Sequence, residues 1–283
     1  MKTVLFLSDF EETSEVAFHY VSDLASRNNL KVILLHVAIP ESSTVSSLIV
    51  SEGEVDDVPV YDTEAANSLS VKALNLLIEN GVKDVKYLVE DGNLVECISK
   101  VVVEHEVDLV IMGTHIPNDY MEKMGNSNTS DIIQNLDRPI LVVPPTAEVF
   151  NLNSLTFATT LKDDQMVAFH VLGDMQRLLG FKADILYLND PADLYAHNGV
   201  KDRVEHLCSA NGLKINQIFV SVHSEHIQQQ IDEFVADKHT DMLAMVTHKR
   251  TGFKRWLFGS MSESAVIKSK IPVLIFEPAH LEG

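Results

Sequence analysis

Residues 107–115 read VDLVIMGTH, and 133 positions later residues 240–248 read TDMLAMVTH. An apolar run of this length, bounded by an acidic residue and a polar turn, is typical of a buried strand. Earlier in each copy, AFHY at 17–20 matches AFHV at 168–171, an offset of 151. The chain therefore contains one internal repeat, with two copies in tandem. The change of offset places about 18 additional residues in the first half, within 38–65.

Each half alternates short apolar runs with segments of helical periodicity. In the first half we expect strands at 4–8, 31–37, 85–89, 109–112 and 140–143, a helix around 16–25 capped by Thr13 or Ser14, and helices at 64–81, 93–106 and 128–136. In the second half we expect strands at 155–158, 183–188, 215–222, 242–246 and 273–276, and helices at 163–179, near 201–210, 226–238 and 262–269. Strands that alternate with helices indicate a parallel, doubly wound sheet. The sequence thus predicts an α/β chain of two tandem domains, 1–147 and 152–280.

The composition excludes several classes of protein. The 283 residues are 46% hydrophobic and 22% charged, with a formal net charge of −19. Residues 1–150 hold 9 basic and 25 acidic side chains, a net of −16, and the remainder has a net of −3. Nucleic-acid binding needs a basic surface, so we expect none. No apolar run reaches the ~20 residues of a membrane span, and a soluble, cytoplasmic protein is expected.

Doubly wound sheets bind ligands beyond the carboxyl ends of their strands, where the strand order reverses. The loop after the first strand carries Asp9 there, whose carboxylate can accept hydrogen bonds from a ribose or an adenine edge. Asp9 is equally suited to cap the following helix. The corresponding residue of the second half is Thr160, which has no carboxylate.

The loop after the fourth strand differs between the halves. In the first half, 113–127 reads GTHIPNDYMEKMGNS, and in the second, 246–260 reads VTHKRTGFKRWLFGS. A Gly or Ser at the head of a helix lets backbone N–H groups approach a phosphate, and the helix dipole favours the anion. The second loop also holds four cations, which would either attract a phosphate or form a solvated face. Neither loop is a P-loop or a dinucleotide fingerprint.

The order of elements and these loops resemble the universal stress protein family over nearly the whole chain. The most specific matches are THKRTG…GS in the second half and DLVIMGTH in the first. The resemblance implies a Rossmann-like, adenine nucleotide alpha hydrolase-like fold. It also implies ATP or AMP as the ligand, bound by an Asp after strand one and by a G-x-x-G-(nine residues)-G-[S/T] loop after strand four.

Both copies depart from that nucleotide pattern. The first half keeps Asp9 and Gly113 but has Ile116 where the pattern has glycine. The nucleotide site implied there consists of Asp9, Val37, Gly113, Asn126 and Ser127, with Asn126 at a glycine position. The second half lacks the acid and the first two glycines, and its candidate phosphate loop consists of Lys249, Arg250, Gly259 and Ser260. A side chain at a close-approach glycine obstructs the ligand, so we expect at most one working site, in the first half.

No catalytic constellation and no metal site are expected. His223 and His226 have no third ligand in view, Cys97 and Cys208 read as buried apolar side chains, and Trp256 is either a docking residue or a cover for its loop.

A ligand-dependent regulatory protein is the first hypothesis, a scaffold without nucleotide the second, and a slow nucleotide hydrolase the third. The resemblance also implies that strands 140–143 and 273–276 pair within the chain as a pseudo-dimer. Dimerisation of whole chains and the protein partners stay open.

Overall fold

The computed structural model describes residues 2–10, 12–38, 63–114, 128–147, 152–161, 166–188, 199–221, 227–246 and 269–276. The elements of the first half are β1 (Thr3–Leu7), α1 (Glu12–Asn28), β2 (Lys31–Ala38), α2 (Thr63–Glu79), β3 (Asp84–Asp91), α3 (Leu94–Glu104), β4 (Leu109–Gly113), α4 (Asn128–Asn135) and β5 (Ile140–Val143). Those of the second half are β6 (Ser154–Thr159), α5 (Met166–Leu179), β7 (Lys182–Tyr187), α6 (Val200–Ala210), β8 (Ile215–Val220), α7 (Ile227–Lys238), β9 (Met242–Val246) and β10 (Val273–Phe276).

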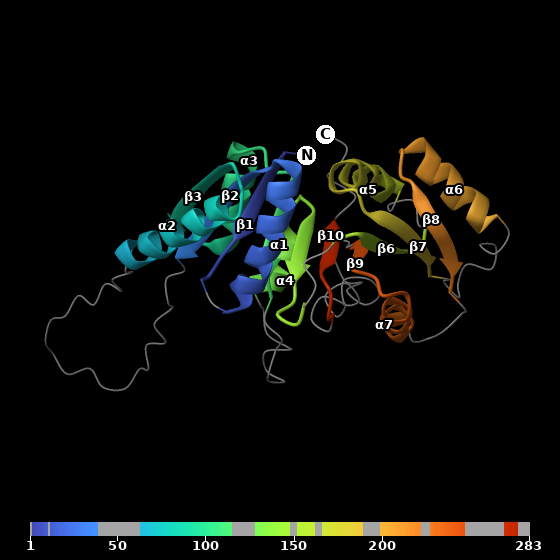
Figure 1. Cartoon of the computed structure of the whole chain (residues 1–283). Helices are drawn as coiled ribbons and strands as arrows, with labels where there is room; N and C mark the ends of the chain where they lie inside the picture. The colour runs from blue at the N-terminus through green and yellow to red at the C-terminus, as the bar shows by residue number, and fades with distance from the viewer. Residues whose placement is uncertain are drawn as a thin grey trace, which may run out of the picture.

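All the strands form one ten-stranded sheet in the order β3-β2-β1-β4-β5-β10-β9-β6-β7-β8. Each half contributes five neighbouring strands, and the two halves lie side by side (Figure 1). Every strand pair within a half is parallel. The halves join through β5 and β10, which pair antiparallel with Leu141 opposite Leu274. The predicted intrachain pseudo-dimer is therefore confirmed.

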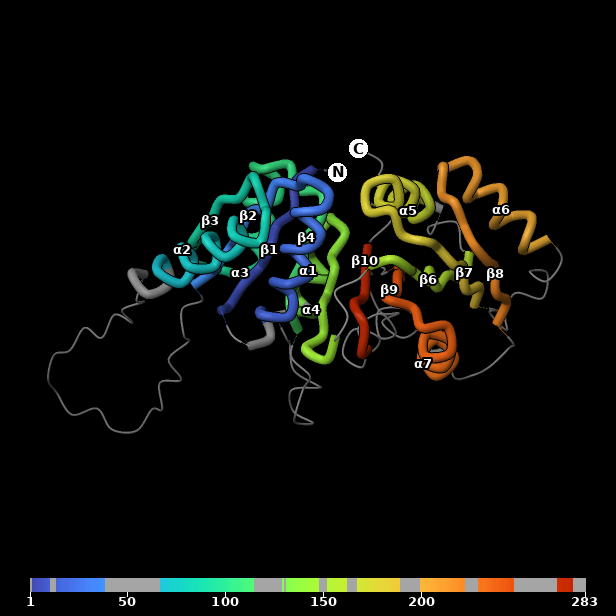
Figure 2. Tube along the Cα trace, viewed as in Figure 1, coloured from blue at the N-terminus to red at the C-terminus, as the bar shows by residue number. Residues whose placement is uncertain are grey.

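Helices cover both faces of the sheet, as the trace in Figure 2 shows. One apolar core holds residues of α1, α2, α5 and α6, and the other holds residues of α3, α4 and α7. Because both faces are covered, the central strands are buried throughout, and this is why they read as continuous apolar runs. The predicted doubly wound parallel sheet is confirmed in both halves.

An aromatic pair repeats at the offset of the sequence repeat. Phe6 of β1 meets Phe18 of α1 edge to face, with ring centroids 6.3 Å apart. Their counterparts, Phe157 of β6 and Phe169 of α5, meet in the same way at 5.4 Å. Such pairs contribute about 0.5–1.5 kcal/mol beyond the area they bury. The same contact therefore fixes the first helix on the first strand in each half.

A carboxylate clamp also repeats, at the amino ends of the strands. Asp108, just before β4, accepts hydrogen bonds from the backbone N–H groups of Lys2 (2.6 Å) and Thr3 (3.0 Å). Its counterpart Asp241, just before β9, accepts one from the N–H of Ser154 at 2.9 Å. Each clamp ties the start of the first strand to the start of the fourth. Asp108 and Asp241 therefore have a structural role in their respective halves.

The boundaries differ from the predictions in a few places. The N-cap prediction at Thr13 or Ser14 is wrong, because α1 already begins at Glu12, directly after a turn in which Phe10 has φ 62°. Gly81 (φ 90°) and Gly180 (φ 75°) end α2 and α5 as expected, because glycine adopts the left-handed conformation without strain. Most of the insertion in 38–65 lies outside the described residues, and so do His223, His226 and Trp256. The predicted helix at 262–269 lies outside them as well, except for Ser269, which is not helical.

Candidate functional site

The strand order reverses at β1, which pairs with β2 on one side and with β4 on the other. Leu7 of β1 lies opposite Leu35 of β2 and Met112 of β4. Asp9, Val37 and Gly113 each follow one of these three residues by one or two positions. The structure therefore brings these three predicted site residues to one edge, at the switch point. The other two, Asn126 and Ser127, lie outside the described residues.

Asp9 is exposed and is oriented by its own loop. The hydroxyl of Ser14, in the first turn of α1, donates a hydrogen bond to Asp9 Oδ1. The backbone N–H of Asp9 donates in return to Ser14 Oγ at 3.2 Å. Ser8 Oγ accepts from the N–H of Phe10 at 3.1 Å, closing the same turn. These local bonds hold the carboxylate at the end of β1 and leave it accessible to a polar ligand.

An aromatic pair lies beside Asp9. The ring of Phe10 lies over the imidazole of His36, with centroids 4.8 Å apart and planes tilted by 31°. His36 Nδ1 is 2.9 Å from the carbonyl oxygen of Ser8. A carbonyl can only accept, so Nδ1 carries the proton, and in the neutral ring Nε2 is an acceptor. Both residues are half-buried, so this edge presents a flat aromatic surface as well as a carboxylate.

Sequence reasoning missed Phe10 and His36. The repeat offset of 151 could have found them, because it aligns Phe10 with Leu161 and His36 with Tyr187. The two copies have diverged at this position, because the stacking pair of the first half is replaced by a leucine and a tyrosine in the second. Nothing in the first-half sequence alone distinguishes Phe10 from a core residue.

The equivalent edge of the second half is closed. Thr160, Leu161, Tyr187 and Leu188 are all buried, with 7%, 4%, 2% and 2% of their surface exposed. Val246, the counterpart of Gly113, is also buried. The loop residues predicted for this half, Lys249, Arg250, Gly259 and Ser260, lie outside the described residues. At the described positions, the first half is therefore open where the second is filled by side chains.

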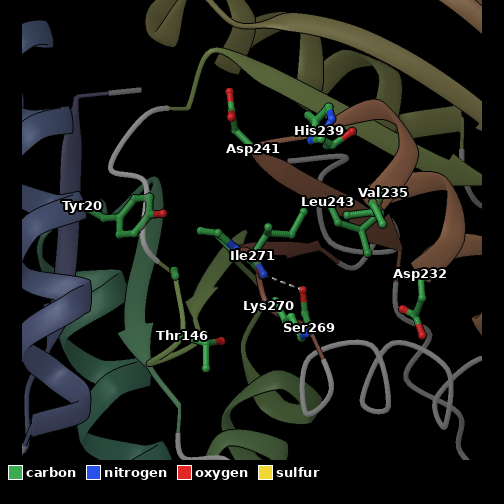
Figure 3. Close-up of a pocket in the computed structure, with 14 residues that line it drawn as sticks. Tyr20, Thr146, Asp232, Val235, His239, Asp241, Leu243, Ser269, Lys270 and Ile271 are labelled. Atoms are coloured by element: carbon green, nitrogen blue, oxygen red, sulfur yellow. Dashed lines mark hydrogen bonds between the residues drawn. The ribbon is translucent and has the colours of Figure 1, made fainter.

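A separate cavity of about 670 Å³ lies between the halves (Figure 3). Tyr20 enters it from α1 in the first half, and residues of α7 and of the segments before β9 and β10 line the other side. Asp241 borders the cavity, but its carboxylate is bonded to Ser154 as part of the clamp. Burial, and secondarily the charge of Asp241, raise the pKa of Tyr20 to about 12. This cavity lies at the amino ends of β9 and β10, away from the switch point.

Other predictions about individual residues can be assessed. Cys97 and Cys208 are buried free thiols, as expected. Burial raises the pKa of both, that of Cys208 to about 12, which makes them poor nucleophiles at neutral pH. Among the residues that the structure describes, no three His, Cys, Asp or Glu side chains are grouped so as to hold a metal ion. No helix in the described ranges is both long and apolar enough to cross a bilayer.

Comparison with known proteins agrees with this architecture. The model of the universal stress protein family matches the chain twice, at residues 1–144 and 155–277. Universal stress protein MJ0577 of Methanocaldococcus jannaschii is 32% identical over 152 residues, which cover 50% of this chain and 94% of that protein. Universal stress protein Slr1230 of Synechocystis is 22% identical over 98% of this chain and 100% of its own length.

A solved structure shares the whole fold. A universal stress protein from Archaeoglobus fulgidus covers 98% of both chains with a TM-score of 0.74, at 15% sequence identity. Its likeness therefore extends across both halves and the junction between them. Two family matches in tandem, on a ten-stranded sheet that joins two doubly wound halves, show that this chain belongs to the universal stress protein family.

Proposed function

We propose that this chain is a regulatory universal stress protein that binds one adenine nucleotide, ATP or AMP, at the carboxyl edge of its first half. One observation carries the proposal: the positions at the switch point are exposed or half-buried in the first half and buried in the second. A ligand needs accessible surface at this edge, and only the first half offers it at the described positions.

The roles of the residues follow from their chemistry. The Asp9 carboxylate accepts hydrogen bonds from the ribose hydroxyls. The rings of Phe10 and His36 offer a face on which a purine stacks. Gly113 has no side chain, so a ligand can approach the backbone at the end of β4. Asn126 and Ser127, which precede α4 in the sequence, would meet the phosphates through backbone N–H groups, which the helix dipole favours.

A binding role fits these residues better than a catalytic one. Hydrolysis of a phosphoanhydride needs a positioned water or base and stabilisation of the developing charge, usually by a metal or by cations. The described part of this edge supplies one carboxylate and one imidazole, and no group of three His, Cys, Asp or Glu side chains that could hold a metal lies among the described residues. The alternative is a scaffold that binds no nucleotide, favoured by the Ile116 and Asn126 substitutions in the phosphate loop.

The test is native mass spectrometry of the gently purified chain, followed by calorimetric titration with ATP and with AMP. We expect one nucleotide per chain. Asp9→Ala should weaken binding by about tenfold or more, because charge-assisted hydrogen bonds of about 1.5–3 kcal/mol are lost. Thr160→Ala, at the equivalent position of the second half, is the matched control and should leave affinity unchanged.

The outcomes separate the hypotheses. No heat up to millimolar nucleotide, where binding is worth only about 4 kcal/mol, would favour the scaffold. A loss of affinity in Arg250→Ala but not in Asp9→Ala would move the site to the second half. Release of inorganic phosphate from bound ATP, abolished by Asp9→Ala, would replace the binding role with hydrolysis.

A further inference from the structure

The outer end of the first half exposes apolar side chains in an unusual concentration. Four of the large hydrophobic residues that are more than 40% exposed lie on α2: Leu69, Val71, Leu76 and Ile78, at 44%, 41%, 41% and 51%. They flank the buried stripe of Ser70 and Leu77 on both sides. A helix on a soluble surface normally carries polar residues at such positions.

The second half provides an internal control. Its helix α6 occupies the same place in the repeat, between the second and third strands. Apart from Ala210 at its end, the residues that α6 exposes are polar or charged, among them Lys201, Asp202, Arg203, Glu205 and His206. The apolar surface of α2 is therefore not a requirement of the fold at this position.

Among the described residues, the strand beside α2 has a partner on one side only. β3 is the first strand of the sheet, and no strand of the described residues pairs with its outer edge. An exposed edge of this kind accepts another strand. The chain already joins its two halves by antiparallel pairing of end strands, β5 with β10. The outer edge of β3 presents the same opportunity to a second molecule.

The sequence of β3, DVKYLVED from Asp84 to Asp91, is complementary to itself when two copies run antiparallel. With Leu88 opposite Leu88, Lys86 lies opposite Glu90 of the second copy, and the reverse pair forms on the other side of the axis. Tyr87 then lies opposite Val89. Opposite charges, and an aromatic side chain facing a β-branched one, are favourable cross-strand pairs.

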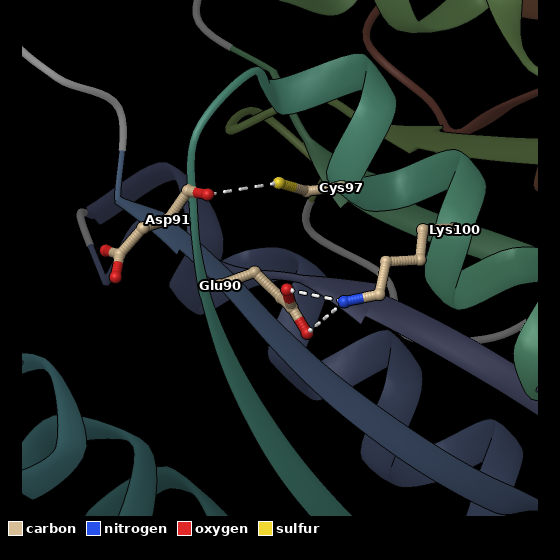
Figure 4. A network of polar contacts seen from close by, with 4 residues as sticks. All are labelled: Glu90, Asp91, Cys97 and Lys100. Carbon is tan, nitrogen blue, oxygen red and sulfur yellow. Dashed lines mark hydrogen bonds and ion pairs between the residues drawn. The ribbon is translucent and has the colours of Figure 1, made fainter.

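The existing contacts of Lys86 and Glu90 leave both side chains able to pair with a second copy. Glu90 is bonded to Lys100 of α3 at 3.1 Å, and both side chains are partly exposed (Figure 4). Lys86 Nζ lies 3.0 Å from His105 Nε2, on the same side of β3. Burial, and then the charge of Lys31, lower the pKa of Lys86. A carboxylate placed opposite Lys86 would counter that effect.

The local charge of the α2–β3 surface permits a second copy of this chain to bind there. The first half carries a net of −16, which by itself opposes self-association. The surface formed by α2 and β3 is locally balanced, however. Between residues 67 and 91, three lysines (Lys72, Lys83, Lys86) stand against four carboxylates (Glu79, Asp84, Glu90, Asp91). Two such surfaces can meet without strong repulsion.

We propose that two copies of this chain associate through the α2–β3 end of their first halves, with β3 paired antiparallel to β3 about Leu88 and the α2 helices covering one face of the junction. The association extends the sheet of one molecule into that of the next. The second half of each molecule, whose α6 exposes mainly polar residues, lies at the end of the sheet away from the junction. This surface is separate from the nucleotide edge, so its test does not depend on the proposed function.

Sedimentation velocity and light scattering on the full chain test the proposal. We expect a dimer that dissociates on dilution. Lys86→Glu should weaken it by about tenfold or more, because like charges then lie directly opposite. The double variant Lys86→Glu with Glu90→Lys should restore it. Ile78→Lys should weaken it as well, while Val220→Lys, on the opposite edge strand β8, is the matched control and should change nothing.

Circular dichroism and thermal unfolding of each variant separate loss of association from loss of folding. A monomer at all concentrations would overturn the proposal. So would a dimer that neither Lys86→Glu nor Ile78→Lys weakens, because it would use another face. Failure of the double variant to restore the dimer, with the fold intact, would refute the pairing about Leu88.

Discussion

The carboxyl edges of the two halves have the same topology but different surfaces. In the first half, Asp9 is exposed and Phe10 and His36 are half-buried. In the second, Leu161 and Tyr187 occupy the positions of those two rings and are buried. Both turns hold this residue in the left-handed region of the backbone, since Phe10 has φ 62° and Leu161 has φ 56°. The comparison teaches that the repeat preserved the turn, whereas side-chain size and polarity decide whether a site exists there.

The largest expected effect follows from the burial of Leu161. Leu161→Ala should lower the free energy of unfolding by about 2–4 kcal/mol, because it leaves a cavity in the core of the second half. Phe10→Ala, its matched control, should cost about 1 kcal/mol, because Phe10 is half-buried. Urea unfolding of both variants measures the difference. Equal losses would mean that the two edges are equally closed, contrary to the comparison.

A second difference lies at Tyr20, whose counterpart in the second half is Val171, a residue that cannot ionise. The pKa of Tyr20 is raised from 10.0 to about 12. Above pH 10 the unfolded chain loses the phenolic proton while the folded chain keeps it, so stability falls as the pH rises from 10 to 12. The loss at pH 12 should be about 2 kcal/mol.

Unfolding of the wild type and of Tyr20→Phe between pH 8 and 12, about the range in which Tyr and Cys titrate, measures this contribution. The variant should lose less stability over that range. Cys208, whose pKa burial also raises, acts in both proteins alike, so the difference between them isolates Tyr20. Identical slopes would show that the buried phenol does not govern the alkaline response.

The smallest expected effect concerns the ligand. Gly113→Val copies Val246 into the first half and should reduce nucleotide affinity about tenfold, or 1.4 kcal/mol, by obstructing the approach to β4. The melting temperature should change little, because valine favours a strand. Titration of this variant beside Val246→Ala checks the prediction. Unchanged affinity in Gly113→Val would show that the nucleotide does not approach this residue.

Much of the architecture could be predicted from the sequence. The offsets between AFHY and AFHV and between VDLVIMGTH and TDMLAMVTH establish the repeat, and the alternation of apolar runs with helical segments predicts the sheet. Gly81 and Gly180 mark helix ends because left-handed backbone favours glycine. The start of α1 could not be placed, because the turn at Phe10 depends on backbone conformation that a non-glycine residue does not announce.

The candidate site was predicted less completely. Asp9, Val37 and Gly113 could be chosen from the resemblance, and the sheet brings them to one edge. The stacking of Phe10 on His36 could not, because these residues are 26 positions apart and meet only when β1 and β2 pair. The exposed face of α2 was missed for a similar reason. Its leucines and isoleucine fit a buried helix by periodicity, and only their exposure in the fold distinguishes them.

The sequence by itself determined the tandem repeat, the α/β class, the family and the acidic character of the first half. These follow from local properties, namely hydrophobic period, residue type and spacing, which do not depend on what each segment packs against. Only the tertiary structure decided which copy of the edge is open, which aspartates are clamps and which helix face is left exposed. Burial and contact are relations between distant residues, and the same side chain becomes core, clamp or ligand group according to its neighbours in space.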